Sequence, residues 1–587
     1  MRFAISAVLV LACAIPALAA DPPAGIIRIT ATYPGADAQT VDETVIAPLF
    51  KQLIGVEGMT RIESEARKDG TGTVTIYFEP KADLNLAQVE AHNRANLALP
   101  VIPAPCRQLG LQVRKLPATP SVFWVALTSV DPKHDAADLA NYATVFFKNE
   151  LALIPGVVDV RVVGVGELGI RVRVNPDRLR AYRVSVGDVV DALRRQNAEA
   201  AAGGKIGGRV VTASGRLTKP EEFGNVILRA TPNGEVLRVK DVAQVELGYA
   251  TGGLAGSGLA RVNGKPAALI AVTAWPGRVT VDKLYKIDAI EELPPGMSFD
   301  VVADLAADRL MEVELRVPDS KLLEEKVEQA TELIRGLPGK PDTVAFAKGR
   351  RSDAATILVK LPAKGGPTVK DVNKALDALS VAAIRVGSMQ PGGEAFPIRL
   401  ALTGPFEADA DALREVTSRY VKRLLKEPGV AEPGVYPEQP EQHYAVKIDR
   451  DKCAQSGVEL DDVFMMLQAS LGGVHATNTS KFGRMLPVTV QAQPQFARDI
   501  EDLEMLFVRN TTGEMVPLVK FTTIKKALAP PAIVRVNGRR AFIITAAPGN
   551  GKTPAEAAAL CVKLAQEVMP RGYRVKDLTD TPPKKRD

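Results

Sequence analysis

Long hydrophobic runs are what this sequence most lacks. After Ala20 no apolar stretch approaches the roughly 20 residues that a membrane-spanning helix needs. We therefore do not expect the chain to carry a solute or a proton across a bilayer by itself, because such a path needs membrane-spanning segments.

The first residues are the exception. Arg2 precedes an apolar stretch from Phe3 to Ala12, and Ala17-Leu18-Ala19 has the small-residue spacing of a signal-peptidase site. We predict that residues 1–20 are a signal peptide that is cleaved on export. Two alternatives stay open, an uncleaved N-terminal membrane anchor and a lipoprotein site at Cys13.

Aromatic and cysteine residues are also scarce. Aromatics make up 5% of the chain against 46% hydrophobic residues, so its cores must be built mainly from Val, Leu, Ile and Ala. The cysteines are Cys13, Cys106, Cys453 and Cys561. Cleavage would leave three of them, an odd number without a disulfide framework. We interpret the remaining thiols as buried structural residues.

The residue patterns that mark several classes of function are missing from this sequence. The four histidines are scattered, with no Cys/His pair at metal-ligand spacing. The 74 basic and 68 acidic residues are well mixed, without the basic patch of a nucleic-acid-binding protein. No serine, threonine or cysteine occupies a recognisable nucleophile elbow. We therefore expect no enzyme activity, no cofactor, no metal and no nucleic-acid partner.

One motif imitates a phosphate-binding loop. Gly551-Lys552-Thr553 lies between a predicted strand and a predicted helix, where backbone N–H groups cradle phosphates in nucleotide-binding proteins. However, Ala546 stands where the motif has glycine, and Pro548 and Pro554 constrain the loop. An ordinary strand-to-helix turn is the preferred interpretation, and an exported NTPase that depends on Lys552 is kept as a distant hypothesis.

The chain repeats itself at long range. Val262-Asn263-Gly264 recurs as Val536-Asn537-Gly538, an offset of 536 − 262 = 274 residues, and Val172-Arg173-Val174 is echoed by Val446-Lys447-Ile448 at the same offset. Solenoid repeats have periods of about 20–50 residues. The offset therefore indicates a duplicated multi-domain half, and we expect the two halves to pack as pseudo-symmetric copies.

Each half alternates strand and helix patterns. Residues 26–117 have a helical pattern over 37–54, a period-2 strand pattern near 73–78 and a second helical pattern over 84–97. The order predicts a βαββαβ, ferredoxin-like unit with one weakly marked strand. A second such unit is split, and the part after its insert includes a predicted helix over 281–292. The predicted fold class is thus α+β.

The motifs resemble a known family, the resistance-nodulation-division (RND) efflux permeases of the hydrophobe/amphiphile multidrug branch. The resemblance covers about 26–303 and 308–577. The residues that carry it include Tyr33-Pro34-Gly35-Ala36-Asp37, Pro155-Gly156-Val157, Asp241-Val242-Ala243, Val508-Arg509-Asn510 and Gly513-Glu514-Met515-Val516-Pro517-Leu518.

The resemblance implies ferredoxin-like porter subdomains with a docking subdomain inserted in each half, and no transmembrane domain. The family's membrane helices have no counterpart between the halves, because Ala306-Ala307-Asp308-Arg309 joins them directly. The implied domains are porter N1 at 26–117, porter N2 at 118–170 and 260–303, N-terminal docking at 171–259, porter C1 at 310–395, porter C2 at 396–443 and 533–577, and C-terminal docking at 444–532.

The family's drug pocket lies between porter subdomains and is lined by phenylalanine. Positions that match it, or lie beside the matching positions, are Val122, Phe123, Trp124, Val163, Lys348 and Arg350. Strand alternation lets only one of Phe123 and Trp124 face inward. The implied ligand-binding site is therefore less aromatic than in the family.

The resemblance implies a periplasmic protein that binds an amphiphilic ligand or an efflux partner, as an accessory of an envelope efflux system. Its candidate partners are a periplasmic adaptor, an outer-membrane channel or an RND permease. A homo-trimer is a further expectation, although the docking arm is short, with seven residues between Gly208 and Arg216. The alternative is a structural or assembly protein that uses the porter scaffold without a ligand.

Overall fold

The computed structural model describes most of the chain after residue 24. The described residues are 25–163, 168–197, 204–206, 209–211, 216–230, 234–249, 260–305, 307–317, 322–347, 354–362, 365–389, 394–405, 409–481, 484–496 and 499–579. The predicted signal peptide, residues 1–20, lies outside them. Within these ranges no helix is both long and apolar enough to cross a membrane.

The first unit alternates strands and helices as its periodicity predicted. Ile27 and Ile29 of its first strand are buried, whereas Arg28 between them is exposed. Asp37 and Asp83 cap its main helices by accepting backbone N–H bonds. Its elements are β1 (Gly25–Thr32), α1 (Ala38–Val41), η1 (Asp42–Ile46), α2 (Ala47–Leu53), β2 (Met59–Arg67), β3 (Thr71–Phe78), α3 (Leu84–Ala98), α4 (Ala104–Leu109) and β4 (Gln112–Pro117).

The second unit is interrupted by an insert. Its elements are β5 (Ser121–Ser129), α5 (Ala136–Tyr142), η2 (Ala143–Phe147), α6 (Lys148–Leu153), β6 (Val157–Val163), β13 (Ala260–Val262), β14 (Lys265–Pro266), β15 (Ala268–Ala274), α11 (Val281–Leu284), η3 (Asp288–Ile290) and β16 (Met297–Asp304). The helix predicted over 281–292 is wrong in length, because α11 ends at Leu284. The chain then turns into η3, where the Glu150 carboxylate accepts from the Ala289 N–H at 2.9 Å.

The third and fourth units complete the second half. The third contains β17 (Leu310–Arg316), α12 (Leu323–Arg335), β18 (Asp342–Ala347), β19 (Ala354–Lys360), α13 (Val369–Leu376) and β20 (Ala383–Met389). The fourth contains β21 (Ile398–Thr403), α14 (Ala410–Leu424), β22 (Val430–Tyr436), β29 (Ala532–Val536), β30 (Arg539–Pro548), α17 (Pro554–Val568) and β31 (Arg574–Asp577).

The same strand order recurs in all of these units. Among the described strands, the first unit runs β2-β3-β1-β4, the second β6-β15-β5-β16, the third β18-β19-β17-β20 and the fourth β22-β30-β21-β31. If only these four strands of each unit are counted, their order along the chain is second, third, first, fourth every time, with antiparallel neighbours. Helices cover one face of each sheet and bury aliphatic side chains there.

Strands cross between the halves and join these sheets. The β29–β30 hairpin of the second half adds to β2 of the first, and the β13–β14 hairpin of the first half adds to β18 of the second. The hairpin turns are the duplicated Asn-Gly pairs. Asn263 and Asn537 have φ of 52° and 49°, a left-handed conformation that asparagine tolerates.

The two asparagines make equivalent contacts. The Asn263 side-chain oxygen accepts from the Thr343 N–H at 2.8 Å, and the Asn537 oxygen accepts from the Ile62 N–H at 3.1 Å. Their own N–H groups donate to the Thr343 and Ile62 carbonyls at 2.8 Å. Each turn therefore forms two hydrogen bonds with a strand of the other half, one in which the asparagine donates and one in which it accepts.

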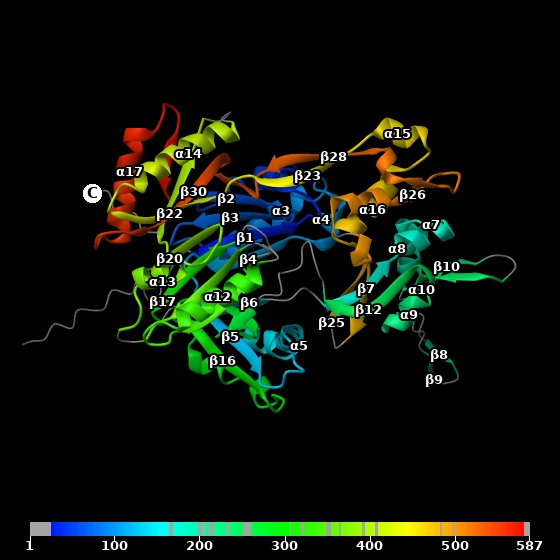
Figure 1. Cartoon of the computed structure of the whole chain (residues 1–587), viewed down its shortest axis with the longest axis horizontal. Helices are drawn as coiled ribbons and strands as arrows, with labels where there is room; N and C mark the ends of the chain where they lie inside the picture. Colours follow the sequence, from blue (N-terminus) through cyan, green and yellow to red (C-terminus); the bar gives the residue numbers. More distant parts are fainter. Residues whose placement is uncertain are drawn as a thin grey trace, which may run out of the picture.

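The inserts of the two halves meet at one end of the long axis of the molecule (Figure 1). The first contains β7 (Leu168–Val174), α7 (Pro176–Tyr182), α8 (Val186–Gln196), β8 (Gly204–Ile206), β9 (Arg209–Val211), α9 (Pro220–Gly224), β10 (Ile227–Ala230), β11 (Val236–Arg238), α10 (Val239–Val242) and β12 (Ala243–Tyr249). The second contains β23 (Glu441–Ile448), α15 (Arg450–Gln455), α16 (Leu460–Leu471), β24 (Val474–Lys481), β25 (Arg484–Ala492), η5 (Pro494–Phe496), η6 (Ile500–Met505), β26 (Phe507–Arg509), β27 (Met515–Pro517), η7 (Leu518–Lys520) and β28 (Thr522–Ala529).

The inserts share one sheet and one core. The described strands run β12-β7-β25-β24, with β25 parallel to β7, and aliphatic residues of both inserts form a single cluster. A capping box begins α8, because the Ser185 hydroxyl accepts from the Asp188 N–H and the Asp188 carboxylate accepts from the Ser185 N–H. The ribbon of β23 and β28 runs from the fourth unit to the inserts (Figure 1).

Candidate functional site

The candidate site lies on β5, where the sequence placed most of the predicted ligand-binding residues. Alternation along this strand sends Val122 and Trp124 to one face and Phe123 to the other. Trp124 is 8% exposed and stacks on Phe346 of β18, with ring centroids 4.2 Å apart. Val163, at the end of β6, packs against the same apolar cluster.

This cluster is an apolar layer between the sheets of the second and third units. Its strands belong to both halves of the chain, since β5 and β15 carry one side and β18, β19 and β20 the other. We name it the inter-sheet layer. Its buried members are Trp124, Ala126, Ala260, Leu269, Ala271, Ala303, Leu310, Val344, Leu358, Met389, Ala395 and Phe396.

Phe123 belongs to a different core. It is 2% exposed and packs among residues beneath the helices of the second unit, including Phe147 and Leu151. The structure therefore brings Val122, Trp124 and Val163 together and separates Phe123 from them. Lys348 and Arg350 lie outside the described residues.

Reasoning from the sequence missed Phe346 and Phe396. Both contribute to the inter-sheet layer, and Phe346 is the direct stacking partner of Trp124. The alternation of Val344 and Phe346 with smaller residues in β18 was a usable signal, because period-2 spacing places both on one face. This spacing does not predict which sheet lies opposite, because that sheet belongs to the other half of the chain.

Arg385 lies at one edge of the inter-sheet layer. The Arg385 guanidinium lies 3.9 Å from the centroid of the Phe396 ring, a cation–π contact. It also binds the Glu314 carboxylate at 2.8 Å and the Glu432 carbonyl at 2.9 Å. Arg385 therefore ties the third unit to the fourth beside the apolar layer, and its hydrogen-bonding capacity is largely used by the protein itself.

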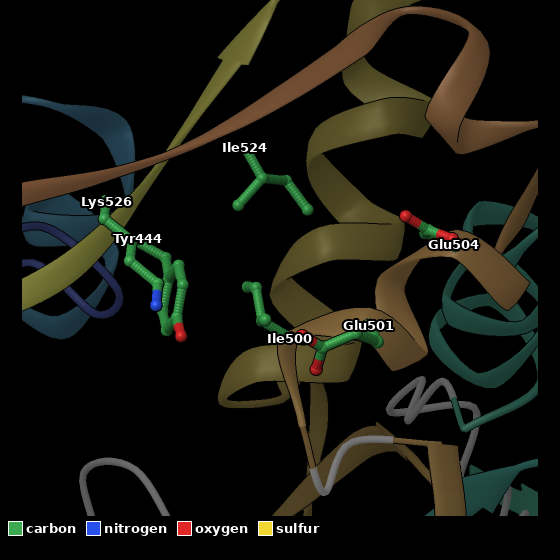
Figure 2. A pocket seen from close by; sticks show the side chains of 6 residues that line it. All are labelled: Tyr444, Ile500, Glu501, Glu504, Ile524 and Lys526. Carbon is green, nitrogen blue, oxygen red and sulfur yellow. The ribbon is translucent and has the colours of Figure 1, made fainter.

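A separate surface hollow lies beneath the β23–β28 ribbon (Figure 2). It encloses about 220 Å³, and its lining residues are Tyr444, Ile500, Glu501, Glu504, Ile524 and Lys526. Figure 2 shows Tyr444 and Lys526 side by side on the ribbon, facing Ile500 and Glu501 of η6. Pockets for drug-sized ligands start near roughly 300 Å³, so this hollow is too small to be the primary candidate.

The three described cysteines are buried, as predicted. Cys106, Cys453 and Cys561 are free thiols that are 0–1% exposed. Burial raises the pKa of Cys106 and of Cys561 to about 11 in each case. Because the reactive form is the thiolate, these residues are unsuited to nucleophilic or redox chemistry at neutral pH.

In the loop that resembles a phosphate-binding site, polar groups cap the helix that follows. The Thr553 hydroxyl contacts the Glu556 carboxylate at 3.0 Å and accepts from the Glu556 N–H at 3.3 Å, a capping box at the start of α17. The Lys552 N–H donates to the Gly549 carbonyl at 3.1 Å, which closes a turn. Among the residues that the structure describes, no group of three or more His, Cys, Asp or Glu side chains is placed to hold a metal ion.

Comparison with known proteins gives a consistent result for both halves. The family model of the AcrB/AcrD/AcrF family matches residues 14–319 and 367–581, which together make up most of the 587 residues. The multidrug export protein AcrF of Escherichia coli is 35% identical over 286 residues, 47% of this chain and 27% of its own length.

Two further relatives show similar figures. The multidrug resistance protein MdtF of Escherichia coli is 33% identical over 270 residues, 44% of this chain and 25% of its own length. The toluene efflux pump membrane transporter TtgB of Pseudomonas putida is 32% identical over 288 residues, 47% of this chain and 26% of its own length.

The chain thus matches about a quarter of the length of these curated relatives. The family model, in contrast, matches segments of both halves, including the exchanged β13–β14 and β29–β30 hairpins. The chain therefore belongs to the AcrB/AcrD/AcrF family of RND multidrug efflux permeases.

Proposed function

We propose that this chain forms the periplasmic porter and docking part of an RND-type efflux system and acts by binding. The βαββαβ units would be ferredoxin-like porter subdomains, and the two inserts would be docking subdomains. Residues 1–20 would direct export to the periplasm, or anchor the chain there if they are not cleaved. No covalent chemistry is proposed.

The observation that carries this proposal is the inter-sheet layer. It is apolar on both walls, contains the Trp124–Phe346 stack and lies where sheets of the two halves face each other. An amphiphile whose apolar part enters between the walls would exchange water for aliphatic and aromatic contacts, which is the usual source of affinity in such pockets. Separation of the two sheets would open this path.

The partners we propose follow from family membership. A periplasmic adaptor, an outer-membrane channel or an RND permease would supply the membrane path and the energy. A homo-trimer is the assembly we propose. Genes for an adaptor or a permease beside the gene for this chain would support the accessory function.

A second candidate function is favoured by the packing of the same layer. Trp124 is 8% exposed and stacks on Phe346, so in the closed arrangement its indole contacts the protein's own side chains instead of a small molecule. Under this alternative the chain is a structural or assembly protein that uses the porter scaffold without a ligand.

Tryptophan fluorescence and thermal unfolding separate these functions. The chain has two tryptophans, so Trp275→Phe leaves Trp124 as the sole reporter of the layer. We expect amphiphiles such as deoxycholate, added below their micellar range, to raise Tm and change Trp124 emission, because binding to the native state stabilises it. A panel of amphiphiles that leaves both signals unchanged, with a protein partner bound tightly, would favour the assembly function.

A further inference from the structure

The face of the first sheet that lies opposite its helices carries two arginines directly across from each other. Pairing of β4 with β1 places Arg114 across from Arg28, and pairing of β1 with β3 continues this row to Thr75. The helices of the first unit cover the other face, where Ile27 and Ile29 are buried. We name this face, with the adjoining edge of β6, the arginine face.

Arg28 is the unpaired member of this face. Its side chain is exposed, and among the described residues no carboxylate lies within ion-pair distance of it. Desolvation nevertheless lowers the pKa of Arg28, and the charge of Arg161 lowers it further, with Tyr77, Glu65 and Asp159 acting in the opposite direction. Charged groups therefore act on this cation without forming an ion pair with it.

The nearby carboxylates have other partners. Glu63 binds Arg61 at 2.8 Å and Arg399 at 2.9 Å. Glu65 accepts from the Tyr436 hydroxyl and lies 3.5 Å from Arg67.

Asp159 of β6 is shared by two cations. It pairs with Arg114 and lies 3.5 Å from Arg161, so one carboxylate serves two guanidinium groups. Arg28 adds a third cation beside this carboxylate, and Glu65, the other carboxylate that acts on Arg28, is paired with Arg67. Like charges directly opposite on neighbouring strands are destabilising, so the arrangement is suited to receiving an anion.

The arginine face adjoins the inter-sheet layer. Pairing of β6 with β15 and of β15 with β5 places Arg161, Ala271 and Trp124 in one cross-strand row. Val163 lies on the same face of β6 two residues beyond Arg161, about 7 Å away at the rise of a strand. A ligand bound to these arginines would therefore have apolar side chains within reach of its tail.

We propose that Arg28, Arg114 and Arg161 bind the anionic head group of an amphiphile, a carboxylate or a sulfate, whose apolar part contacts the inter-sheet layer. Guanidinium groups hold such oxyanions by paired charge-assisted hydrogen bonds. The head-group site stands on the arginine face alone. The contact of the tail rests on the proposed ligand-binding function of the layer.

Acetate and octanoate test the two parts of this proposal on the full-length chain. Both carry one carboxylate, and only octanoate has an apolar tail. Titration by calorimetry at constant ionic strength should give a Kd for octanoate about tenfold or more below that for acetate. Arg28→Gln should weaken both by about tenfold or more, since a charge-assisted hydrogen bond is lost.

The matched control is Arg107→Gln, which removes an exposed arginine of α4 in the same unit. It should change neither Kd by more than about twofold. Arg161→Gln is the second variant, because this side chain is 73% exposed and its loss leaves Asp159 paired with Arg114. Circular dichroism and Tm measured without ligand establish that each variant is folded.

The outcomes distinguish the head-group site from the proposed function. Octanoate binding that neither Arg28→Gln nor Arg161→Gln weakens would overturn the head-group site and leave amphiphile binding intact. Equal Kd values for acetate and octanoate, both raised in the variants, would support the head-group site and overturn the contact of the tail. No binding of either anion to the wild-type chain would overturn the whole inference.

Discussion

Asn263 and Asn537 have the same backbone conformation and the same contacts in the two halves, and they hold the exchanged hairpins in place. The repeated Val-Asn-Gly sequence predicted the duplication. The turn type also follows from it, because Asn-Gly favours tight hairpins with positive φ at both residues. The strand that each asparagine grips belongs to the other half, and nothing in the local sequence specifies it.

Replacing Asn537 with alanine should destabilise the chain by about 2–4 kcal/mol. The change forces alanine into the left-handed region and leaves the Ile62 N–H without its acceptor. Urea unfolding would measure the loss. Asn550→Ala is the control, because Asn550 has φ of 47° in an exposed turn and isolates the backbone contribution. Equal losses in the two variants would contradict a gripping contact at Asn537.

Asp462, at the start of α16, is a carboxyl group whose ionised form is disfavoured where the two inserts meet. Burial raises its pKa, and the charge of Asp188 raises it further, although Arg509 acts in the opposite direction. A carboxyl whose pKa is higher in the folded state stabilises the fold when protonated, and this contribution is lost as the pH rises through that pKa. Ionised Asp462 therefore destabilises the native state at neutral pH.

Asp462→Asn should consequently raise the free energy of unfolding at pH 7, and its advantage should shrink as the pH falls toward the ordinary pKa of aspartate, about 3.9. Unfolding curves at several pH values would measure this. Asp461→Asn, on the exposed neighbouring position, should show no such pH-dependent gain. A loss of stability at pH 7 in Asp462→Asn would contradict the assignment.

At the scale of the element, periodicity located most helices and strands but not their irregularities. The helical pattern over 37–54 contains a π-helical turn, Asp42–Ile46, in which buried Asp42 binds Arg535 of β29 at 2.6 Å. Strand β2 was weakly marked because its charged residues pair across the sheet with the second half, as Glu63 does with Arg399. A single segment holds no information about such partners.

The alternation of β5 makes a prediction about its two faces. Phe123→Ala should lower the free energy of unfolding by about 3–5 kcal/mol, because it leaves a cavity beneath the helices of the second unit. Val122→Ala, on the half-buried face toward the inter-sheet layer, should cost much less. Both are measured by chemical denaturation, and a similar loss for the two variants would contradict the assignment of faces.

At the scale of the whole molecule, only part of the candidate site could be predicted from the sequence. The sequence located Val122, Trp124 and Val163, which the structure gathers in the inter-sheet layer. Phe346 and Phe396 come from the other half, and their opposition to β5 depends on how complete sheets pack. The exchange of strands between the halves depends on how the whole chain folds. A short stretch of sequence therefore does not predict it.

The shared sheets predict that the halves associate without a covalent link. Fragments covering 25–305 and 307–579, produced separately and mixed, should form a 1:1 complex, because each completes a sheet of the other through β13–β18 and β2–β29. Size-exclusion chromatography with light scattering would measure it. Asn537→Gly in the second fragment should weaken the complex, since it removes the side-chain acceptor for the Ile62 N–H. Two fragments that remain monomeric after mixing would contradict the role of the exchanged hairpins.

The exchange also sets the order of events in biosynthesis. Ile62 and Asn537 are 475 residues apart, so the edge of β2 stays bare until nearly the entire polypeptide has been made. Unpaired strand edges invite association with other chains. We therefore expect a nascent first half to be prone to association with other chains until β29 has been made and pairs with β2.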